Sequence, residues 1–300
     1  MDRLDELAVF AAILDTGSLA AAGRRLRRSP PAVTRALAAL EERTGARLLE
    51  RTTRNLAPTE AGLRLGEQAR RVLADYRDAM RGADAEQKLR GLLRVTAPVI
   101  FGRKHVMPLV SAFLAAFPAM QVELVLSDGN LDLIEEGLDV AVRIGKLADS
   151  GMVVRRVGQV RRVTVASPGY LAGKGVPERP ADLAKHDIIF TSRRPDPVAW
   201  RFGTGGRGPV VRLSPRLMVN EGEAALFAAR EGHGITRALS YQVAEDFAAG
   251  ALVRLLARFE PPPLPVQLVV PSARNLPLRV RAFLDHAAQR LGALEVIGGP

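Results

Sequence analysis

The sequence predicts an α+β fold of several domains, and three features support this. Two short helices joined by an arginine-rich turn lie between Gly17 and Leu49. A helix with a continuous apolar stripe follows from Thr59. From Leu92 onward, strand and helix patterns alternate, which is typical of α/β sheets. The 300 residues are enough for two or three such parts.

The helix pair carries its own start signals. Ser18 is the expected N-cap of the first helix, and Ser29 that of the second, where Pro30 takes the first helical position at no hydrogen-bond cost. One face of the second helix is apolar and predicted to be buried: Val33, Leu37 and Leu40. The opposite face carries Pro31, Thr34, Arg35 and Ala38. Small and hydrogen-bonding residues with an arginine, after a basic turn, have the form of a helix-turn-helix.

A preceding helix and a following ribbon complete this part, predicted to be residues 1–58. The preceding helix is expected to pack under the pair through Leu4, Leu7, Ala8, Ala11 and Leu14, and to end at Gly17. After the pair, apolar anchors flank a polar tip of residues 51–55 and predict a two-stranded wing: Leu48, Leu49 and Leu56. Two strands alone are marginally stable, so the wing must lean on the helices, and Pro58 ends it.

A long helix is predicted within residues 59–90, capped by Thr59 with Glu60 at its positive end. Its stripe consists of Leu65, Ala69, Val72, Leu73, Tyr76, Ala79, Met80 and Ala83. A helix between domains has little of its own chain to cover such a stripe. We therefore expect dimerisation through residues 59–90, with packing on the same chain as the alternative.

Residues 91–300 are predicted to form two α/β lobes. The first comprises about 91–161 and 266–300, and the second about 162–265. The pattern favours a parallel sheet, with helices at 102–118 and 131–137 and a closing helix at 276–291. Ligands of such sheets bind beyond the carboxyl ends of the strands, so a cleft between the lobes is expected.

The charge of the chain points to a polyanionic partner. The formal net charge is +11 and the pI is about 10.9. Residues 24–54 hold nine arginines and three glutamates. This concentration favours nucleic acid over a membrane surface or over a general preference for arginine.

Several classes of site are absent from the sequence. There is no cysteine, which excludes disulfides and cysteine metal sites and suits a reducing compartment. No apolar run approaches the ~20 residues of a membrane helix, and the acidic N-terminus is not an export signal, so a cytoplasmic protein is expected.

The match of residues 203–208 to G-x-G-x-x-G precedes a strand and is interpreted as a hairpin turn. No catalytic constellation, cofactor motif or metal-ligand spacing is found, and four histidines are scattered: His105, His186, His233 and His286.

Taken together, the chain resembles the LysR-type transcriptional regulators over nearly its whole length. The specific segment is FAAILDTGSLAAAGRRLRRSPPAVTRALAALEERTGARLLERTTRNLAPTEAG, at residues 10–62. Softer matches are LDLIEEGLDVAVRIG at 131–145 and LAGKGVPERPADLAKHD at 171–187. The resemblance implies a winged helix-turn-helix, a dimerising linker helix and a two-lobed effector domain like periplasmic binding proteins. It also implies homodimers or homotetramers that bend double-stranded promoter DNA in response to a small molecule, with RNA polymerase as a further partner.

The resemblance gives the first helices and the wing a role on DNA. Phosphate contacts are expected from Ser18, Arg28 and Ser29, and close approach from Pro30, Pro31 and Ala32. Thr34 is expected to touch a base edge or the methyl group of a thymine, and Arg35 to reach either a guanine edge or a phosphate. The wing residues Arg51, Thr53 and Arg54 would follow the backbone or enter the minor groove. The family often has glutamine at Pro30 and serine at Thr34, which shifts base reading toward Thr34 and Arg35.

For the effector, the resemblance favours positions at strand and helix ends. These are Thr96, Ala97, Pro98, Ser127, Asp128, Arg143, Thr191, Asn220, Gly234 and Ile235. Most of these groups are hydrogen-bond donors, so a carboxylate is the expected ligand. Three rival classes remain: a DNA-binding protein without a ligand, an enzyme domain fused to a winged helix, and a basic solute-binding protein. The two predicted lobes argue against a protein without a ligand. The absence of catalytic motifs argues against an enzyme, and the absence of an export signal argues against a solute-binding protein.

Overall fold

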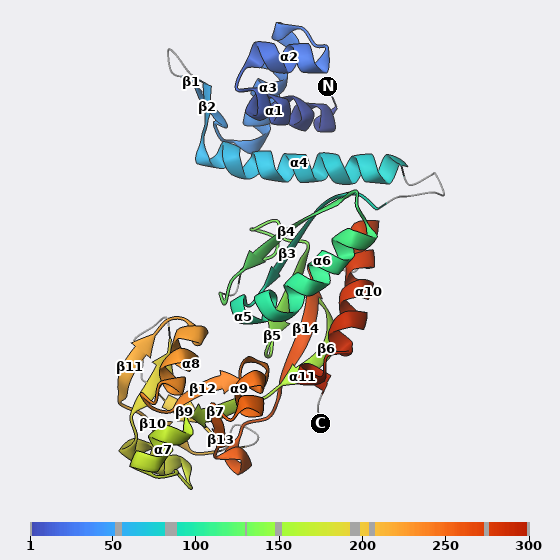
Figure 1. Ribbon diagram of the computed structural model, residues 1–300. Coiled ribbons are helices and arrows are strands. Elements are labelled where there is room, and N and C mark those ends of the chain that lie inside the picture. The colour runs from blue at the N-terminus through green and yellow to red at the C-terminus, as the bar shows by residue number, and fades with distance from the viewer. Residues whose placement is uncertain are drawn as a thin grey trace. The chain divides into compact units, whose positions relative to one another are not determined.

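The computed structural model describes residues 2–51, 56–81, 89–129, 131–147, 152–192, 199–203, 208–272 and 276–298. Its internal contacts divide the chain into two compact units, Met1–Gly91 and Leu92–Pro300 (Figure 1). The tip of the predicted wing, residues 52–55, lies outside the described residues, as does Ala83 of the predicted stripe.

The first unit is a helical domain with a short ribbon. Its elements are α1 (Arg3–Thr16), α2 (Leu19–Leu26), α3 (Pro30–Thr44), β1 (Leu49–Arg51), β2 (Leu56–Pro58) and α4 (Glu60–Arg81). β1 and β2 pair antiparallel, as the wing prediction requires. Gly17 ends α1 in the left-handed conformation, and Thr59 Oγ1 accepts the Gly62 amide at the start of α4. The predicted helix-turn-helix and wing are therefore confirmed.

The buried face of α1 differs from the prediction. Val9, Phe10 and Ile13 are buried, whereas Leu4 and Leu7 are only partly buried. Helices α2, α3 and α4 all contact α1. A helix covered from several sides buries apolar residues around most of its circumference, so one-sided spacing does not identify its core face.

The stripe of α4 divides into two parts. Ala69 is buried, and a Cβ at Gly66 would come within 2.2 Å of Leu14 Cδ1, so α4 lies directly on α1. Further along, Val72 and Tyr76 remain 44% and 45% exposed. The first part of the stripe thus packs on its own chain, whereas Val72 and Tyr76 are nearly half exposed in the single chain.

The second unit begins with a lobe built on a five-stranded sheet, here called lobe I. Its strand order is β4 (Met120–Leu126), β3 (Gly91–Ala97), β5 (Val140–Ile144), β14 (Leu264–Val270), β6 (Val153–Val160). β3 and β5 run parallel, but β14 is antiparallel to both of its neighbours. The predicted parallel sheet is therefore a mixed one, because β14 returns from the second lobe against the direction of β5.

Helices cover this sheet and close its core. They are α5 (Val99–Phe101), the π-helix η1 (Gly102–Val106), α6 (Met107–Ala116), α10 (Leu278–Gly292) and α11 (Glu295–Gly298). α6 and α10 pack against each other, with the rings of Phe113 and Phe283 edge to face at 5.2 Å (Figure 1). The helix predicted at 131–137 is wrong: these residues form turns, in which Asp132 Oδ1 accepts the amides of Ile134 and Glu135.

One run of this lobe corrects an expectation about membranes. Val99–Ala116 is long and apolar enough to cross a membrane by length and composition alone, with a mean hydropathy of 1.3. Leu109, Val110 and Phe113 of this run are buried in the lobe. A helix that covers a sheet passes the same test, so the run gives no membrane assignment.

Lobe II is built from three small sheets. β12 (Thr236–Leu239) and β13 (Val253–Leu255) flank β7 (Arg162–Ala166) antiparallel, and β8 (Ile188–Thr191) pairs parallel with β11 (Pro215–Val219). β9 (Ala199–Arg201) pairs antiparallel with β10 (Val210–Arg212), whereas most of the turn predicted at residues 203–208 lies outside the described residues. The helices are α7 (Pro168–Lys174), η2 (Pro180–Lys185), α8 (Gly222–Arg230), η3 (Ser240–Gln242), α9 (Ala244–Ala249) and η4 (Ala257–Phe259). The chain passes between the lobes after β6 and again before β14.

Candidate functional site

Helix α3 presents one face to the core and one to solvent. Val33, Leu37 and Leu40 are buried, as predicted from their spacing. Thr34 and Arg35 are exposed on the other side. The start of the helix follows from its residues: Ser29 is the N-cap and Pro30 the first helical residue, although the Ser29 hydroxyl makes no capping bond. Ser18 Oγ does cap α2, accepting the Ala21 amide at 3.4 Å.

The exposed side chains of α3 are held by their own helix. Thr34 Oγ1 donates to the Pro30 carbonyl at 3.2 Å, and Arg35 Nε donates to the Pro31 carbonyl at 3.4 Å. Within the described residues, the two terminal nitrogens of Arg35 have no partner. Pro31 is exposed and Ala32 partly exposed beside them, so this face combines the terminal nitrogens of Arg35 with small apolar groups.

Arginines next to α3 are already paired with acids. Arg28 Nη2 lies 2.8 Å from Asp5 Oδ2, and Asp15 bridges Arg25 at 3.2 Å and Arg70 at 2.7 Å. Asp15 therefore joins α2 to α4 through two guanidinium groups. In the wing, the backbone of Arg51 ends β1, while Thr53 and Arg54 lie outside the described residues.

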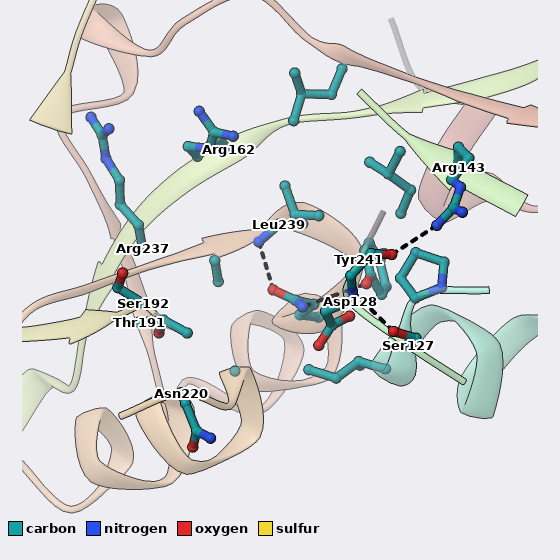
Figure 2. A pocket seen from close by; sticks show the side chains of 18 of the residues that line it. Ser127, Asp128, Arg143, Arg162, Thr191, Ser192, Asn220, Arg237, Leu239 and Tyr241 are labelled. Carbon is teal, nitrogen blue, oxygen red and sulfur yellow. Dashed lines mark hydrogen bonds between the residues drawn. The ribbon is translucent and has the colours of Figure 1, made fainter. Parts of the chain in front are cut away.

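The second unit contains a cavity of about 620 Å³ between its two lobes. Lobe I contributes Pro98, Ile100, Ser127, Asp128, Gly129, Arg143, Ile144, Lys146 and Leu264. Lobe II contributes Arg162, Thr191, Ser192, Asn220, Gly222, Arg237, Ala238, Leu239, Tyr241 and Gln242. Figure 2 shows Arg143, Ser127 and Asp128 at one end, and Arg162 and Arg237 at the other.

Six of the ten effector positions named from the sequence line this cavity: Pro98, Ser127, Asp128, Arg143, Thr191 and Asn220. They follow strands β3, β4 and β11 or lie at the carboxyl ends of β5 and β8, where the sheet rule places ligand contacts. Asp128 Oδ1 accepts the Val99 amide at 3.0 Å, and Ser127 Oγ accepts the Gly129 amide at 3.1 Å. These two residues thus shape the loops as well as line the cavity.

Four of the ten positions do not line the cavity. Thr96 and Ala97 are fully buried in β3. Gly234 and Ile235 join two strands of lobe II: the Ile235 amide donates to the Asp187 carbonyl, and the Ile189 amide donates to the Ile235 carbonyl, both at 2.9 Å. A Cβ at Gly234 would lie 2.3 Å from the Asp187 carbonyl oxygen, so glycine is needed for this close approach. All four residues therefore have a structural role in packing and strand pairing.

The cavity is strongly cationic. Arg143, Lys146, Arg162 and Arg237 line it, and Asp128 is the only acidic residue among its described lining. Arg143 is buried, and burial lowers the pKa of its guanidinium. Its terminal nitrogens donate to the carbonyls of Gly129 and Leu131 at 3.0 and 2.8 Å. Arg143 therefore organises this loop and adds positive charge next to Ser127.

The sequence did not identify the lobe II cations. Arg162 and Arg237 come from β7 and β12, and only the antiparallel pairing of those strands brings them together. Tyr241 was also missed. Its ring lies edge on to Phe101 at 5.1 Å, and burial raises the pKa of its hydroxyl. The one available signal was the alternation of polar and apolar residues at the start of β7, Arg162–Ala166.

Comparison with known proteins assigns both units. Residues 4–63 match the bacterial regulatory helix-turn-helix protein, lysR family, and residues 86–292 match the LysR substrate binding domain. The chain belongs to the LysR family of transcriptional regulators. This LysR-type regulator has a DNA-binding helix-turn-helix and an effector-binding domain, and its relatives are regulators, not enzymes.

Its relatives are similar over their full length. The regulator PtxR of Pseudomonas aeruginosa is 35% identical over 97% of this chain and 93% of that protein. The structure of CrgA, a LysR-type regulator from Neisseria meningitidis, is 32% identical with a TM-score of 0.62, covering 96% of this chain and 98% of CrgA. Full-length AphB, a virulence activator of Vibrio cholerae, is 27% identical with a TM-score of 0.59, covering 96% and 99%.

Proposed function

We propose that this regulator is controlled by a small molecule with a carboxylate group, bound in the cavity between lobes I and II. One observation carries the proposal: four cationic side chains and one carboxylate line the described cavity. Low-dielectric walls focus such a field and raise the local concentration of anions. Asp128 already accepts a backbone amide, which offsets part of its charge.

Neutral groups on lobe II complete the proposed contacts. Thr191 ends β8 and Asn220 follows β11, so both reach the cavity from the carboxyl ends of parallel strands. A ligand that touches these residues and Ser127 of lobe I bridges the lobes. It shifts the regulator only as far as its affinities for the open and closed arrangements differ.

The DNA contacts proposed for the first unit follow the exposed face of α3. Thr34 and Arg35 would read base edges, with Pro30, Pro31 and Ala32 at close approach. Ser18, Arg28 and Ser29, with the wing residues Arg51, Thr53 and Arg54, would contact the backbone. Proline at position 30 has no side-chain donor, so Arg35 has the larger share of base reading.

The assembly proposed is a homodimer through residues 59–90 that pairs further into a homotetramer on promoter DNA. The uncovered Val72 and Tyr76 of α4 support it. Residues 1–58 would be the DNA-binding domain, and 91–300 the effector-binding domain. Binding to promoter DNA places the protein in the cytoplasm, where RNA polymerase is a further partner.

A thermal-shift screen tests the effector class. The full chain is melted with small organic acids and with the matching amides, which have the same shape and no charge. Acids should raise the melting temperature and change binding to promoter DNA. Stabilisation by neutral or cationic compounds alone would refute the carboxylate class. Asn220→Ala should weaken acid binding, and Ser214→Ala, exposed on lobe II outside the cavity, should not.

A further inference from the structure

Two arginines of lobe II form a pair at one end of the cavity. In the antiparallel pairing of β12 with β7, Leu239 lies opposite Arg162, and Arg237 lies opposite Thr164. The two arginines are thus diagonal neighbours on one face of the ribbon, within reach of each other for long side chains. Figure 2 shows them away from Arg143 and Ser127, across the cavity.

Arg237 is held in a fixed orientation. Its guanidinium carbon lies 4.1 Å from the centre of the Phe202 ring and 4.9 Å from the centre of the Trp200 ring. One terminal nitrogen donates to the Arg201 carbonyl at 3.1 Å. Stacking on aromatic rings fixes the plane of a guanidinium and leaves its edge free for a bidentate acceptor.

The charge of this pair is not balanced within the described residues. Arg237 Nε is buried without a hydrogen-bond partner there, and Arg162 makes no ion pair. Burial first, and the charge of Arg162 next, lower the pKa of Arg237. The charge of Glu260 raises the pKa of Arg237, but this carboxylate is already held by Arg254 through bonds of 2.6 and 2.7 Å. Two like charges at neighbouring positions, one of them fixed and neither with a counterion among the described residues, indicate a place for an anion.

We infer that Arg162 and Arg237 form a second anion subsite, and that the effector of this regulator carries two acidic groups, one for each end of the cavity. The inference rests on the proposed function and narrows its ligand class to dicarboxylates. The first acidic group would lie near Arg143 and Lys146 of lobe I. Between the ends, Thr191, Ser192 and Asn220 offer uncharged hydrogen-bonding groups, which suits the neutral middle of such a molecule.

Binding of matched probes to the full chain tests this inference. Succinate, glutarate, adipate and pimelate are compared with their monomethyl esters, which keep the length and lose one charge. At the best length, the diacid should bind on the order of tenfold more tightly than its ester, the gain expected from one charge-assisted contact. The measurement is calorimetric titration, with melting temperature as a second readout.

Two variants locate the second charge. Arg237→Gln and Arg162→Gln should reduce the affinity for the diacid to that for its ester, and the melting temperature without ligand shows whether each variant is still folded. Arg237→Lys should keep part of the preference, because the charge remains and the planar stack is lost. Arg212→Gln is the matched control, since Arg212 is an exposed arginine of lobe II that does not line the cavity.

The outcomes separate this inference from the proposed function. If esters bind and diacids bind no better, the second subsite is refuted and the carboxylate proposal stands. If Arg237→Gln abolishes ester binding, a single subsite at Arg237 replaces the two. If neither the acids nor the esters bind, both proposals fail together. A diacid preference that survives both glutamine variants also refutes the subsite.

Discussion

Lys104 Nζ lies 3.0 Å from Glu245 Oε1, an ion pair that joins the π-helix of lobe I to α9 of lobe II. A second contact joins the π-helix to η3 of lobe II, because the ring of His105 lies 5.6 Å from that of Tyr241. Both contacts lie near the cavity, which Tyr241 lines. The π-helix Gly102–Val106 therefore contributes side-chain contacts from lobe I to lobe II, beside the ring of Phe101 in α5.

The adjacent acids Glu245 and Asp246 should differ sharply in their contribution to stability. Glu245 is 84% exposed, so Glu245→Gln should lower the free energy of unfolding by less than ~1 kcal/mol. The Asp246 side chain is 11% exposed and binds Arg230 through two bonds of 2.7 and 3.0 Å. Asp246→Asn should cost about 1.5–3 kcal/mol, because it weakens charge-assisted bonds in a half-buried pair. Urea denaturation measures the free energy of unfolding of both variants. Equal losses of stability in the two variants would contradict the prediction that Asp246 contributes more than Glu245.

Acid should destabilise the effector-binding domain partly through His105. Burial lowers the pKa of His105 below its ordinary 6.5, the Lys104 charge lowers it further, and Glu245 opposes both. Below pH 6.5 the unfolded chain therefore binds a proton that the folded chain does not, so stability falls as the pH drops.

His105→Phe should remove this part of the pH dependence. The phenyl ring keeps the contact with Phe101, whose ring lies 5.0 Å away, and it removes a ring nitrogen with no partner among the described residues. Urea denaturation at several pH values above and below 6.5 measures how steeply the free energy of unfolding changes with pH in the original protein and in the variant. His186, whose pKa burial also lowers, is present in both and cancels in the difference. An unchanged slope would show that His105 does not titrate in this range.

Gly234 should be required for folding, whatever the effector. Its φ of +148° and its approach to the Asp187 carbonyl leave no room for a side chain. Gly234→Ala should cost at least about 1–3 kcal/mol of stability, the range for a strained backbone. Gly169→Ala is the control, because its Cβ would meet nothing within 4 Å and alanine is favoured in helix α7. Thermal melting without ligand distinguishes the two, and a tolerated Gly234→Ala would reopen a role in ligand contact.

The sequence predicted those parts of the fold that depend on local chemistry. Gly17, Ser18 and Thr59 sit where a helix must end or begin, and their bonds involve residues within a few positions. The strand ends that carry Ser127, Thr191 and Asn220 were found in the same way. The carboxyl end of a buried strand is visible in the sequence, and the sheet rule then places it at the cavity.

The missed features depend on pairings between distant segments. Arg162 and Arg237 meet because β7 and β12 pair antiparallel, and Trp200 reaches Arg237 from another sheet. The direction of β14 is likewise set by the return of the chain from lobe II. No short-range pattern encodes these pairings. The burial of Phe10 was missed because α1 is covered on several sides.

The exposed part of α4 should mediate dimerisation. Val72→Asp and Tyr76→Asp should each shift the protein toward monomer in sedimentation equilibrium, because a charge would have to be buried in an apolar seam. Both side chains are nearly half exposed in the single chain, so folding of the first unit should survive. Glu67→Lys, at an exposed position on the opposite face of the same helix, should leave the dimer intact. A dimer that tolerates both changes would place the interface elsewhere.

Arg35 should determine the sequence preference of α3. Arg35→Ala should weaken binding to the best site from in vitro selection by about 1–3 kcal/mol, the range for one bidentate base contact. Binding to random DNA should change much less, because phosphate contacts dominate there. Arg47→Ala removes an exposed arginine of the same unit that lies outside α3. Any loss of binding should be the same for the selected site and for random DNA. Fluorescence anisotropy at several salt concentrations measures the two losses. Equal losses on selected and random DNA for Arg35→Ala would make Arg35 a phosphate contact and leave base reading to Thr34.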